Sequence, residues 1–557
     1  MEGKNILGFL FFTIAAVLLI HVTISNFPRP PPTPSDLLAC ASNSAYCTSK
    51  NRILRHPATV AANDHTTDVP HHPLDPLTVR EVNKVYEAIK SLFEKSAYTV
   101  HSLVLEEPDK AVVLRWRKGD PLPPREASVM ARSAGKNYLL TVGVESGDVV
   151  QHDTSHISGF PLVTLEDMQS VIKAPLASAH FNRTIVARGV DPNDVACLPF
   201  SPGWFGEAED GRRLVKLECF TTTETANFYM RPIEGIIVLT DLDTHEIVEI
   251  VDKGRHIPIP KGAGTDYRLS AANGPIIKLP NPISMEQPSG PNFVIEDDHL
   301  VKWANWEFHL KPDPRAGVVV SQAKIRDPDT GVLRNVMYKG FASELFVPYM
   351  DPEEAWYFKT YMDAGEYGFG LQALPLDPLN DCPRNAKYMD AIFAAADGTP
   401  YVRENMVCVF ERYAGDAAWR HTESPIVGDE MIREARPKVT LVARMVASLA
   451  NYDYIVDWEF HADGLIHVKV ALTGIVIVKG TSYVNMNEVK ENENLYGTLL
   501  SDNIIGVVHD HYVNFHLDMD IDGQDNSFLN VHLKREYTQG RSQGGSRVVG
   551  RPPFPVR

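Results

Sequence analysis

The stretch Ser448-Leu449-Ala450-Asn451-Tyr452-Asp453-Tyr454 lies in the second half of the chain, where short aromatic, strand-like runs follow one another. Turn signals such as Asp327-Pro328-Asp329-Thr330-Gly331 separate these runs, and no apolar pattern of helical length and period dominates this half. We therefore predict that it folds as one large antiparallel β domain, a β-sandwich.

The region on the N-terminal side of this domain shows a helix followed by strands. Thr78 and Glu81 form a capping box, and the apolar residues that follow recur at helical spacing, which predicts an amphipathic helix. Strand-like runs come next, at Thr99–Leu105, Val112–Trp116 and Tyr138–Val144. This order is typical of a small α+β domain.

The same order of elements returns further along the chain. Thr164 and Asp167 make a second capping pair, and strand-like runs follow at Ile236–Leu239 and Ile247–Val251. A repeat of this length indicates a duplicated domain rather than a solenoid. The predicted fold class is therefore mixed α+β and all-β, with two small tandem α+β domains followed by the β-sandwich.

Composition shifts along the 557 residues give the predicted domain boundaries. In order, these are a signal peptide or signal anchor (1–27), a Pro/Ser-rich tether (28–72), a first small α+β domain (73–160), a second small α+β domain (161–256), a linker (257–290), the β-sandwich (291–529) and a Gly/Arg-rich tail (530–557).

The overall composition is that of a folded protein. Apolar residues make up 44% of the chain, charged residues 22% and aromatic residues 9%, which excludes wholesale disorder and a coiled coil. The formal net charge is −17, so no global positive field attracts a polyanion. We do not expect nucleic acid as a partner.

An apolar segment, Ile6–Ile24, follows Lys4 and precedes a proline-rich run. Its length lies between the roughly 7–15 residues of a cleavable signal and the roughly 20 that span a bilayer. It predicts either a signal peptide, which gives an extracellular protein, or a retained anchor, which would tie the protein to a membrane.

Both outcomes place the chain in the secretory pathway, where disulfides and N-glycosylation occur. The six cysteines permit fifteen pairings, and local spacing favours three pairs, Cys40 with Cys47, Cys197 with Cys219, and Cys382 with Cys408. Asn182-Arg183-Thr184 is a glycosylation sequon, and the alternative is a chance triplet.

Two groups of polar residues in the β half could bind metal. His509 and His511 alternate along a strand-like run, which places both imidazoles on one face, where Zn, Cu or Ni could bind; the alternative is two incidental histidines. Asp518, Asp520 and Asp522 alternate in the same way, which suggests either a Ca²⁺ or Mn²⁺ site or a solvated acidic turn.

Asp363 is a candidate general base. It lies in the aromatic and glycine-rich run Tyr361–Gly370. A carboxyl group in such a low-dielectric environment has its pKa raised toward the range that is useful for proton abstraction. The same run could equally form an aromatic hairpin.

The sequence resembles the copper amine oxidases in the order of three features: Asp363, the Asn451-Tyr452-Asp453 motif and the His509-x-His511 pair. In that family the tyrosine of the motif is oxidised to topaquinone. The separations, 89 residues from Asp363 to Tyr452 and 57 from Tyr452 to His509, are approximately those of the family. The resemblance runs from about residue 73 to about 528 and is greatest with the plant branch. Ser448 stands where the family has Thr.

The resemblance implies oxidation of primary amines, diamines and polyamines in particular, to an aldehyde, ammonia and hydrogen peroxide. O₂ would be the second substrate, the assembly a homodimer and the location the apoplast. The implied site residues are Tyr452 as topaquinone precursor, Asp363 as base, Tyr361 as substrate gate, Tyr349 and Asn451 as cofactor-binding residues, His509 and His511 as two of three copper ligands, and Asp518, the Met519 carbonyl and Asp520 as a second site for Ca or Mn. The resemblance also implies the Cys197–Cys219 and Cys382–Cys408 disulfides.

The chain departs from the family at its C-terminal end. The family takes its third copper histidine from a His-His-x-Pro-like segment well beyond the His-x-His pair, and the remaining histidines here, His516 and His532, match no such segment. We predict a truncated product without the third ligand and with a disordered, non-homologous tail. The alternative function is an inactive homologue that at most binds metal or pairs with another subunit.

Overall fold

The computed structural model describes residues 69–153, 159–203, 205, 211–271, 283–425, 428, 430–528, 530, 533–537 and 546–550. The predicted signal or anchor, most of the tether, the Cys40–Cys47 pair and His532 lie outside the described residues. Among the helices in the described part, none is both long and apolar enough to cross a membrane.

The chain divides into two units. One comprises Met1–Thr59 and Arg268–Asn273, and its described part contains the short helix η3 (Leu269–Ala271). The other comprises Val60–Tyr267 and Gly274–Arg557 and contains all the elements that follow.

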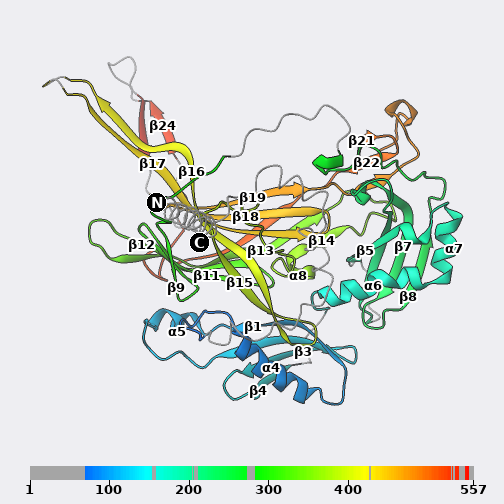
Figure 1. The fold of residues 1–557 in the computed structure, drawn as a ribbon, viewed down its shortest axis with the longest axis horizontal. Coiled ribbons are helices and arrows are strands. Elements are labelled where there is room, and N and C mark those ends of the chain that lie inside the picture. The colour runs from blue at the N-terminus through cyan, green and yellow to red at the C-terminus, as the bar shows by residue number, and fades with distance from the viewer. Residues whose placement is uncertain are drawn as a thin grey trace, which may run out of the picture. The chain divides into compact units, whose positions relative to one another are not determined.

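The first small domain packs one helix on a four-stranded antiparallel sheet (Figure 1). The helix is α4 (Val79–Leu92), and the strands, in sheet order, are β1 (Tyr98–Glu106), β2 (Glu126–Ser133), β3 (Lys136–Gly143) and β4 (Val149–Asp153). The predicted capping box is present, because Glu81 N donates to Thr78 Oγ1 at 3.2 Å and Thr78 N donates to Glu81 Oε2 at 2.9 Å.

The strand predicted at Val112–Trp116 is wrong, because the segment forms the short helix α5 (Lys110–Arg115). Asp109 occupies its N-cap position, and Val113 is its only buried residue. A strand in a half-buried sheet buries alternate side chains, and this segment does not. The strand propensity of its valines is therefore not expressed.

The second small domain repeats this plan, as the duplicated pattern predicted. Its elements are α6 (Leu165–Ala177), α7 (Ala179–Ala187), η1 (Pro192–Asp194), β5 (Val195–Phe200), β6 (Leu214–Thr221), η2 (Phe228–Met230), β7 (Pro232–Asp241) and β8 (Ile247–Asp252). The strands form an antiparallel sheet in the order β5-β6-β7-β8, and the Cys197–Cys219 disulfide joins β5 to β6.

The large domain is antiparallel throughout, which confirms the predicted fold class. A seven-stranded sheet contains β14 (Thr360–Met362), β13 (Leu333–Pro348), β12 (Gly317–Arg326), β11 (Trp306–Asp313), β10 (Leu300–Trp303) and β9 (Val294–Glu296), with β23 (Tyr512–Met519) also paired to β13. A five-stranded sheet contains β15 (Lys387–Ala394), β16 (Pro400–Glu423), β17 (Ile432–Leu449), β18 (Tyr452–His461) and β19 (Ile466–Gly474). A three-stranded sheet contains β20 (Val478–Gly480), β22 (Ile504–Val507) and β21 (Gly497–Ser501), and the helix η4 (Met486–Glu488) precedes β21.

One apolar core joins the two larger sheets. Phe308 of β11 and Phe460 of β18 are fully buried and stack with their ring centroids 4.0 Å apart. The Cys382–Cys408 disulfide, which the family resemblance also implied, fixes β16 to the loop before β15.

The tail was predicted to be disordered, and this is wrong for two of its segments. β24 (Leu533–Tyr537) pairs antiparallel with β25 (Ser546–Gly550). Tyr537, Val548 and Val549 are residue types with high strand propensity, and the Gly- and Arg-rich composition concealed them.

Candidate active site

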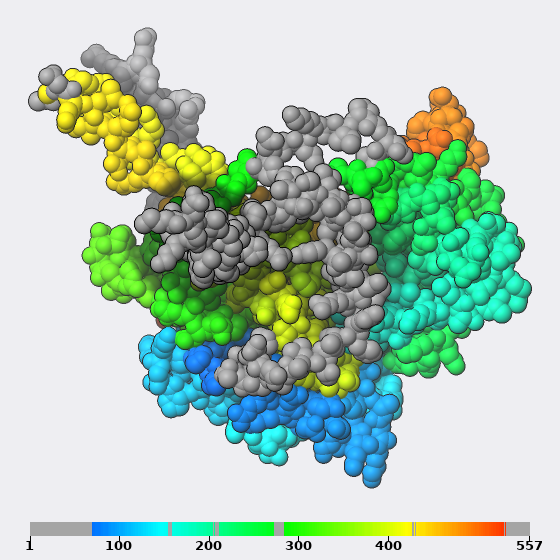
Figure 2. Space-filling model, viewed as in Figure 1, coloured from blue at the N-terminus to red at the C-terminus, as the bar shows by residue number. Residues whose placement is uncertain are grey.

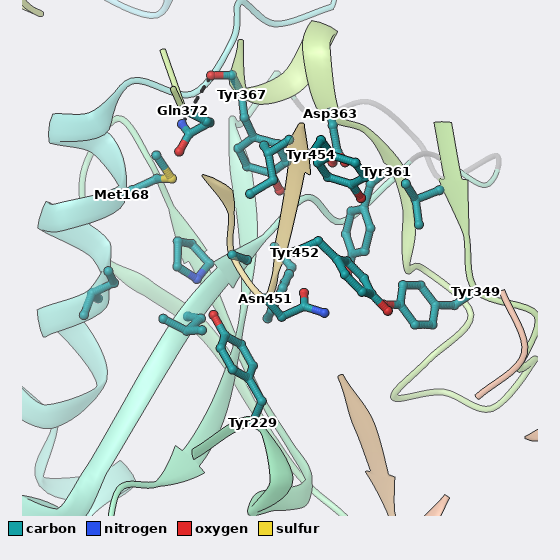
Figure 3. Close-up of a pocket in the computed structure, with 17 residues that line it drawn as sticks. Met168, Tyr229, Tyr349, Tyr361, Asp363, Tyr367, Gln372, Asn451, Tyr452 and Tyr454 are labelled. Carbon is teal, nitrogen blue, oxygen red and sulfur yellow. Dashed lines mark hydrogen bonds between the residues drawn. The ribbon is translucent and has the colours of Figure 1, made fainter. Parts of the chain in front are cut away.

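A cavity of about 230 Å³ lies between the second small domain and the large domain (Figure 3). The second domain supplies one wall, with Met168 and Ile172 of α6, Leu198, Pro199 and Phe200 of β5, and Tyr229 of η2. The large domain supplies Val347, Tyr349, Tyr361, Asp363, Tyr367, Gln372, Leu449, Ala450, Asn451, Tyr452 and Tyr454. Among these described lining residues Asp363 is the only charged one, so the cavity is aromatic with a single carboxyl group.

A tight turn places Tyr452 in the cavity. Leu449 of β17 pairs with Tyr452 of β18, so Ala450 and Asn451 form the connection, and Ala450 has a φ of 52°. The positive φ lies at the first residue of this connection, where Ala is less favourable than Gly or Asn. Asn451 Nδ2 donates to the Ile475 carbonyl at 2.7 Å and so fixes the turn.

Asp363 is the first residue of α8 (Asp363–Tyr367), directly after β14. The alternative prediction of an aromatic hairpin is therefore wrong; the helix ends at Gly368, whose φ of 77° suits glycine. Burial raises the pKa of the Asp363 carboxyl well above its usual range, and the Glu366 and Glu344 carboxylates raise it further. This is the direction predicted from the sequence.

Tyr349 and Tyr361 flank Asp363 and Tyr452 in the cavity wall (Figure 3). Burial raises the pKa of the Tyr349 phenol well above its usual range, and its hydrogen bond with Tyr452 raises it further. The Tyr361 side chain is buried, and its hydroxyl has no hydrogen-bond partner among the described residues. Both residues therefore lie where the predicted cofactor-binding and gating roles would place them, and the roles themselves stay predictions.

The two histidines meet Tyr452 on its hydroxyl side. His509 Nε2 lies 2.7 Å from Tyr452 Oη, and His511 Nδ1 lies 2.9 Å from Tyr454 Oη. The His509 and His511 ring centroids are 5.1 Å apart. The predicted proximity is confirmed, but the predicted strand is wrong, because the histidines lie in the connection between β22 and β23.

The hydrogen bonds of the histidines set which ring nitrogen carries the lone pair, and at His509 a metal would have to displace the Tyr452 hydroxyl from Nε2. The Val507 carbonyl can only accept, so His509 Nδ1, at 2.8 Å, donates to it and Nε2 carries the lone pair. Burial lowers the pKa of His511 to about 4, and the nearby His509 contributes to this shift. Both features favour the neutral imidazole, which is the form that binds copper.

The copper ligand set is nevertheless incomplete in the described part of the chain. Two groups of three ligating side chains occur there, His72 with Asp75 and His309, and Glu459 with His461 and His467. Neither group includes His509 or His511. His516 is exposed and stacks on Phe341. The residues present therefore fit copper in kind and in protonation, but they supply two imidazoles.

The predicted second metal site does not fit a divalent cation. Asp518 and Asp520 both bind the Lys110 ammonium, and Asp522 binds Arg334. The Met519 carbonyl accepts from Asn526 Nδ2 at 2.7 Å. Asp520 Oδ2 has no partner among the described residues, but the other carboxylate oxygens of Asp518 and Asp520 and the Met519 carbonyl are already bound within the chain.

Several residues of the site were not predicted from the sequence. Tyr454 contacts His511, and its position two residues after Tyr452 on β18 could have shown that both side chains lie on one face. Glu366 is half-buried, and its desolvation raises its pKa to about 7; it accepts a hydrogen bond from Ser201 Oγ at 2.8 Å. The wall from the second domain had no sequence signal, because it depends on how two domains pack.

Comparisons with known proteins agree with this site. Three family models match the chain: the copper amine oxidase enzyme domain over residues 294–549, the N2 domain over 72–154 and the N3 domain over 166–270. The enzyme-domain match continues past residue 529, the predicted end of the β-sandwich.

Similar proteins cover most of the chain. The copper-containing amine oxidase gamma 1 of Arabidopsis thaliana is 54% identical over 85% of this chain and 67% of that protein. The gamma 2 protein of the same plant is 52% identical over 85% of this chain and 69% of its own length. A crystal structure of a copper-containing benzylamine oxidase from Hansenula polymorpha shares the fold with a TM-score of 0.75, at 22% identity over 86% of this chain and 76% of that one.

Fold, cavity and relatives together define a copper-containing oxidoreductase of the class that acts on primary amines. The chain belongs to the copper amine oxidase family.

Proposed function

We propose that the cavity oxidises small primary amines, diamines and polyamines in particular, in the reaction RCH₂NH₂ + O₂ + H₂O → RCHO + NH₃ + H₂O₂. The observation that supports this proposal is the placement of Asp363 and Tyr452 in one aromatic cavity, with the Tyr452 hydroxyl 2.7 Å from His509 Nε2. A base, an oxidisable phenol and a metal-binding imidazole are thus within one site.

Tyr452 is the residue that copper and O₂ would convert to topaquinone. The quinone, when present, supplies an electrophilic carbonyl for the primary amine and an electron sink that acidifies its α-carbon. Asp363 accepts the α-proton, and its raised pKa makes it a stronger base than an exposed carboxylate. Tyr349 and Asn451 hold Tyr452 in position, and Tyr361 controls entry beside Asp363.

The proposed preference for diamines and polyamines follows from the net charge of the chain and from the aromatic lining of the cavity. The net charge of −17 attracts cationic amines from solution, and polyamines carry the most charge. The aromatic wall formed by residues such as Phe200 and Tyr229 suits the methylene chain of such a substrate.

Copper binding is the part of the site with the fewest ligands among the described residues. His509 and His511 would hold the ion, and even loss of an outer-shell partner typically costs about 10–100-fold in metal affinity. With two such imidazoles in the described part of the chain, the second candidate is a homologue that does not turn over until a third ligand is supplied. A chimera in which the residues after 529 are replaced by the corresponding remainder of the gamma 1 relative separates the cavity from this defect.

The pH dependence of this chimera tests the role of Asp363. The base must be ionised to accept a proton, and its pKa is raised, so kcat should rise with pH over a range above that of an ordinary carboxyl group. Peroxide release from saturating 1,4-diaminobutane, measured across pH, gives this profile. A kcat that stays constant down to the ordinary carboxyl range, about pH 4, would exclude Asp363 as the base.

We also propose a homodimer in which the outer part of the β16–β17 hairpin contacts a second copy. The hairpin pairs with β15 and β18 only at its inner end, and beyond Val409 and before Thr440 its two strands pair only with each other. Its outer part, in yellow, is accessible on the face shown in Figure 2. It exposes 48% of Trp419 and 69% of Ile432. Aromatic side chains such as Trp are enriched at protein interfaces.

Light scattering on the purified chain measures this assembly. We expect twice the chain mass of 62.0 kDa, and the monomer mass after Trp419→Asp combined with Ile432→Asp. A monomer for the unmodified chain at micromolar concentration would overturn the dimer proposal.

Passage through the secretory pathway is proposed as well, and the two disulfides support it. Glycosylation at Asn182 stays a prediction. The Asn182 side-chain amide donates to the Leu176 carbonyl at 2.9 Å and Thr184 is buried, so a glycan would have to be attached before α7 forms.

A further inference from the structure

The acidic group at the end of β23 holds a cation that comes from the chain itself. Lys110 Nζ lies 2.7 Å and 2.8 Å from the two carboxylate oxygens of Asp518 and 2.9 Å from Asp520 Oδ1. Lys110 is the first residue of α5 in the first small domain, 408 residues from Asp518. The contact therefore joins two domains.

The surroundings of the ammonium group favour an organic cation over a metal ion. The Tyr338 ring, which is buried, lies beneath Lys110 Nζ at 4.6 Å from its centroid, as in a cation–π contact. Ca²⁺ needs six to eight oxygen ligands at about 2.3–2.6 Å, and an aromatic face supplies none. The Met519 carbonyl is occupied by Asn526.

The ammonium and a metal ion cannot share this position. A Ca²⁺ ion bound to the same oxygens of Asp518 and Asp520 would occupy the volume that the Lys110 ammonium fills, because both sit within about 3 Å of those oxygens. The ammonium also supplies the positive charge that two neighbouring carboxylates require.

We propose that Lys110 takes the place of the second metal ion in this chain, so that the site needs no Ca²⁺ or Mn²⁺ and instead ties the first small domain to the large domain. Removal of the ammonium would leave Asp518 and Asp520 facing each other. Asp520 Oδ2, buried and without a partner among the described residues, would then be available to an incoming cation. Once the ammonium is gone, the four carboxylate oxygens of Asp518 and Asp520, completed by water, can bind Ca²⁺, so Lys110→Ala should convert the internal ion pair into a calcium site. The proposal does not depend on amine oxidation.

The experiment uses the full purified chain, dialysed against millimolar CaCl₂ or MnCl₂ and then against metal-free buffer. Elemental analysis gives the bound metal, and thermal melting is followed with CaCl₂ and with a chelator. We expect the unmodified chain to retain neither metal at this site and to melt at the same temperature in both conditions. Lys110→Ala should melt at a lower temperature with chelator and recover on addition of CaCl₂.

Two controls make the result specific. Lys84→Ala removes a half-buried lysine whose partner is Glu145, at 3.0 Å, and should leave the calcium response unchanged. Asp518→Asn in the Lys110→Ala background should abolish the gained response.

Retention of about one Ca²⁺ or Mn²⁺ by the unmodified chain, lost in Asp518→Asn, would overturn the proposal. So would a folded Lys110→Ala variant that does not respond to calcium. The metal content of the unmodified chain decides the first point even if the variant fails to fold.

Discussion

Asp363→Asn in the chimera with the gamma 1 remainder should lower amine-dependent peroxide release at least ~100-fold, within the range usual for general-base catalysis. The substitution keeps the shape of the side chain and removes its ability to accept a proton. Because Asp363 is buried and is the only charged side chain among the described residues that line the cavity, no neighbour in that wall can replace it.

Asp502→Asn is the matched control, since Asp502 is exposed and lies outside the cavity lining. It should leave the rate unchanged. Near-normal peroxide release from 1,4-diaminobutane by Asp363→Asn would contradict the assignment of the base. If Asp363→Asn binds as much copper as the unmodified chimera and melts at the same temperature, its loss of activity is chemical rather than structural.

The roles of Tyr452 and Asp363 could be predicted because the order and spacing of their motifs resemble those of the copper amine oxidases. The turn at Ala450 and Asn451 places Tyr452 at the start of β18, and the carbonyl of Ile475 fixes that turn. The spacing of His509 and His511 likewise brings their rings together, although the segment is not a strand. The raised pKa of Asp363 follows from its aromatic neighbours in the sequence.

Contacts between distant segments could not be predicted in this way. Phe200 and Tyr229 reach the cavity only because the second domain packs against the large one. Lys110 begins the helix α5, in a region where the prediction placed a strand over Val112–Trp116, and its partners Asp518 and Asp520 were assigned to a metal. No periodicity or propensity in either segment indicates that they meet.

The second large effect concerns formation of the quinone. The described part of the unmodified chain offers His509 and His511 as copper ligands. Oxidation of Tyr452 needs bound copper and O₂, so we expect Tyr452 to remain a phenol. The chimera regains the remainder of a copper-containing relative and should form the quinone. Tyr452→Phe in the chimera should abolish quinone absorbance entirely, because no phenol is left to oxidise at that position.

The most direct test is a redox-cycling quinone stain, combined with copper analysis, on residues 69–557 and on the chimera after aerobic incubation with Cu²⁺. We expect no stain for the unmodified chain, a stain with about one copper per chain for the chimera, and no stain for the Tyr452→Phe variant of the chimera. A stained chain with about one copper bound would show that His516, His532 or a partner subunit completes the ligand set. A chimera that binds copper without staining would contradict Tyr452 as the quinone precursor.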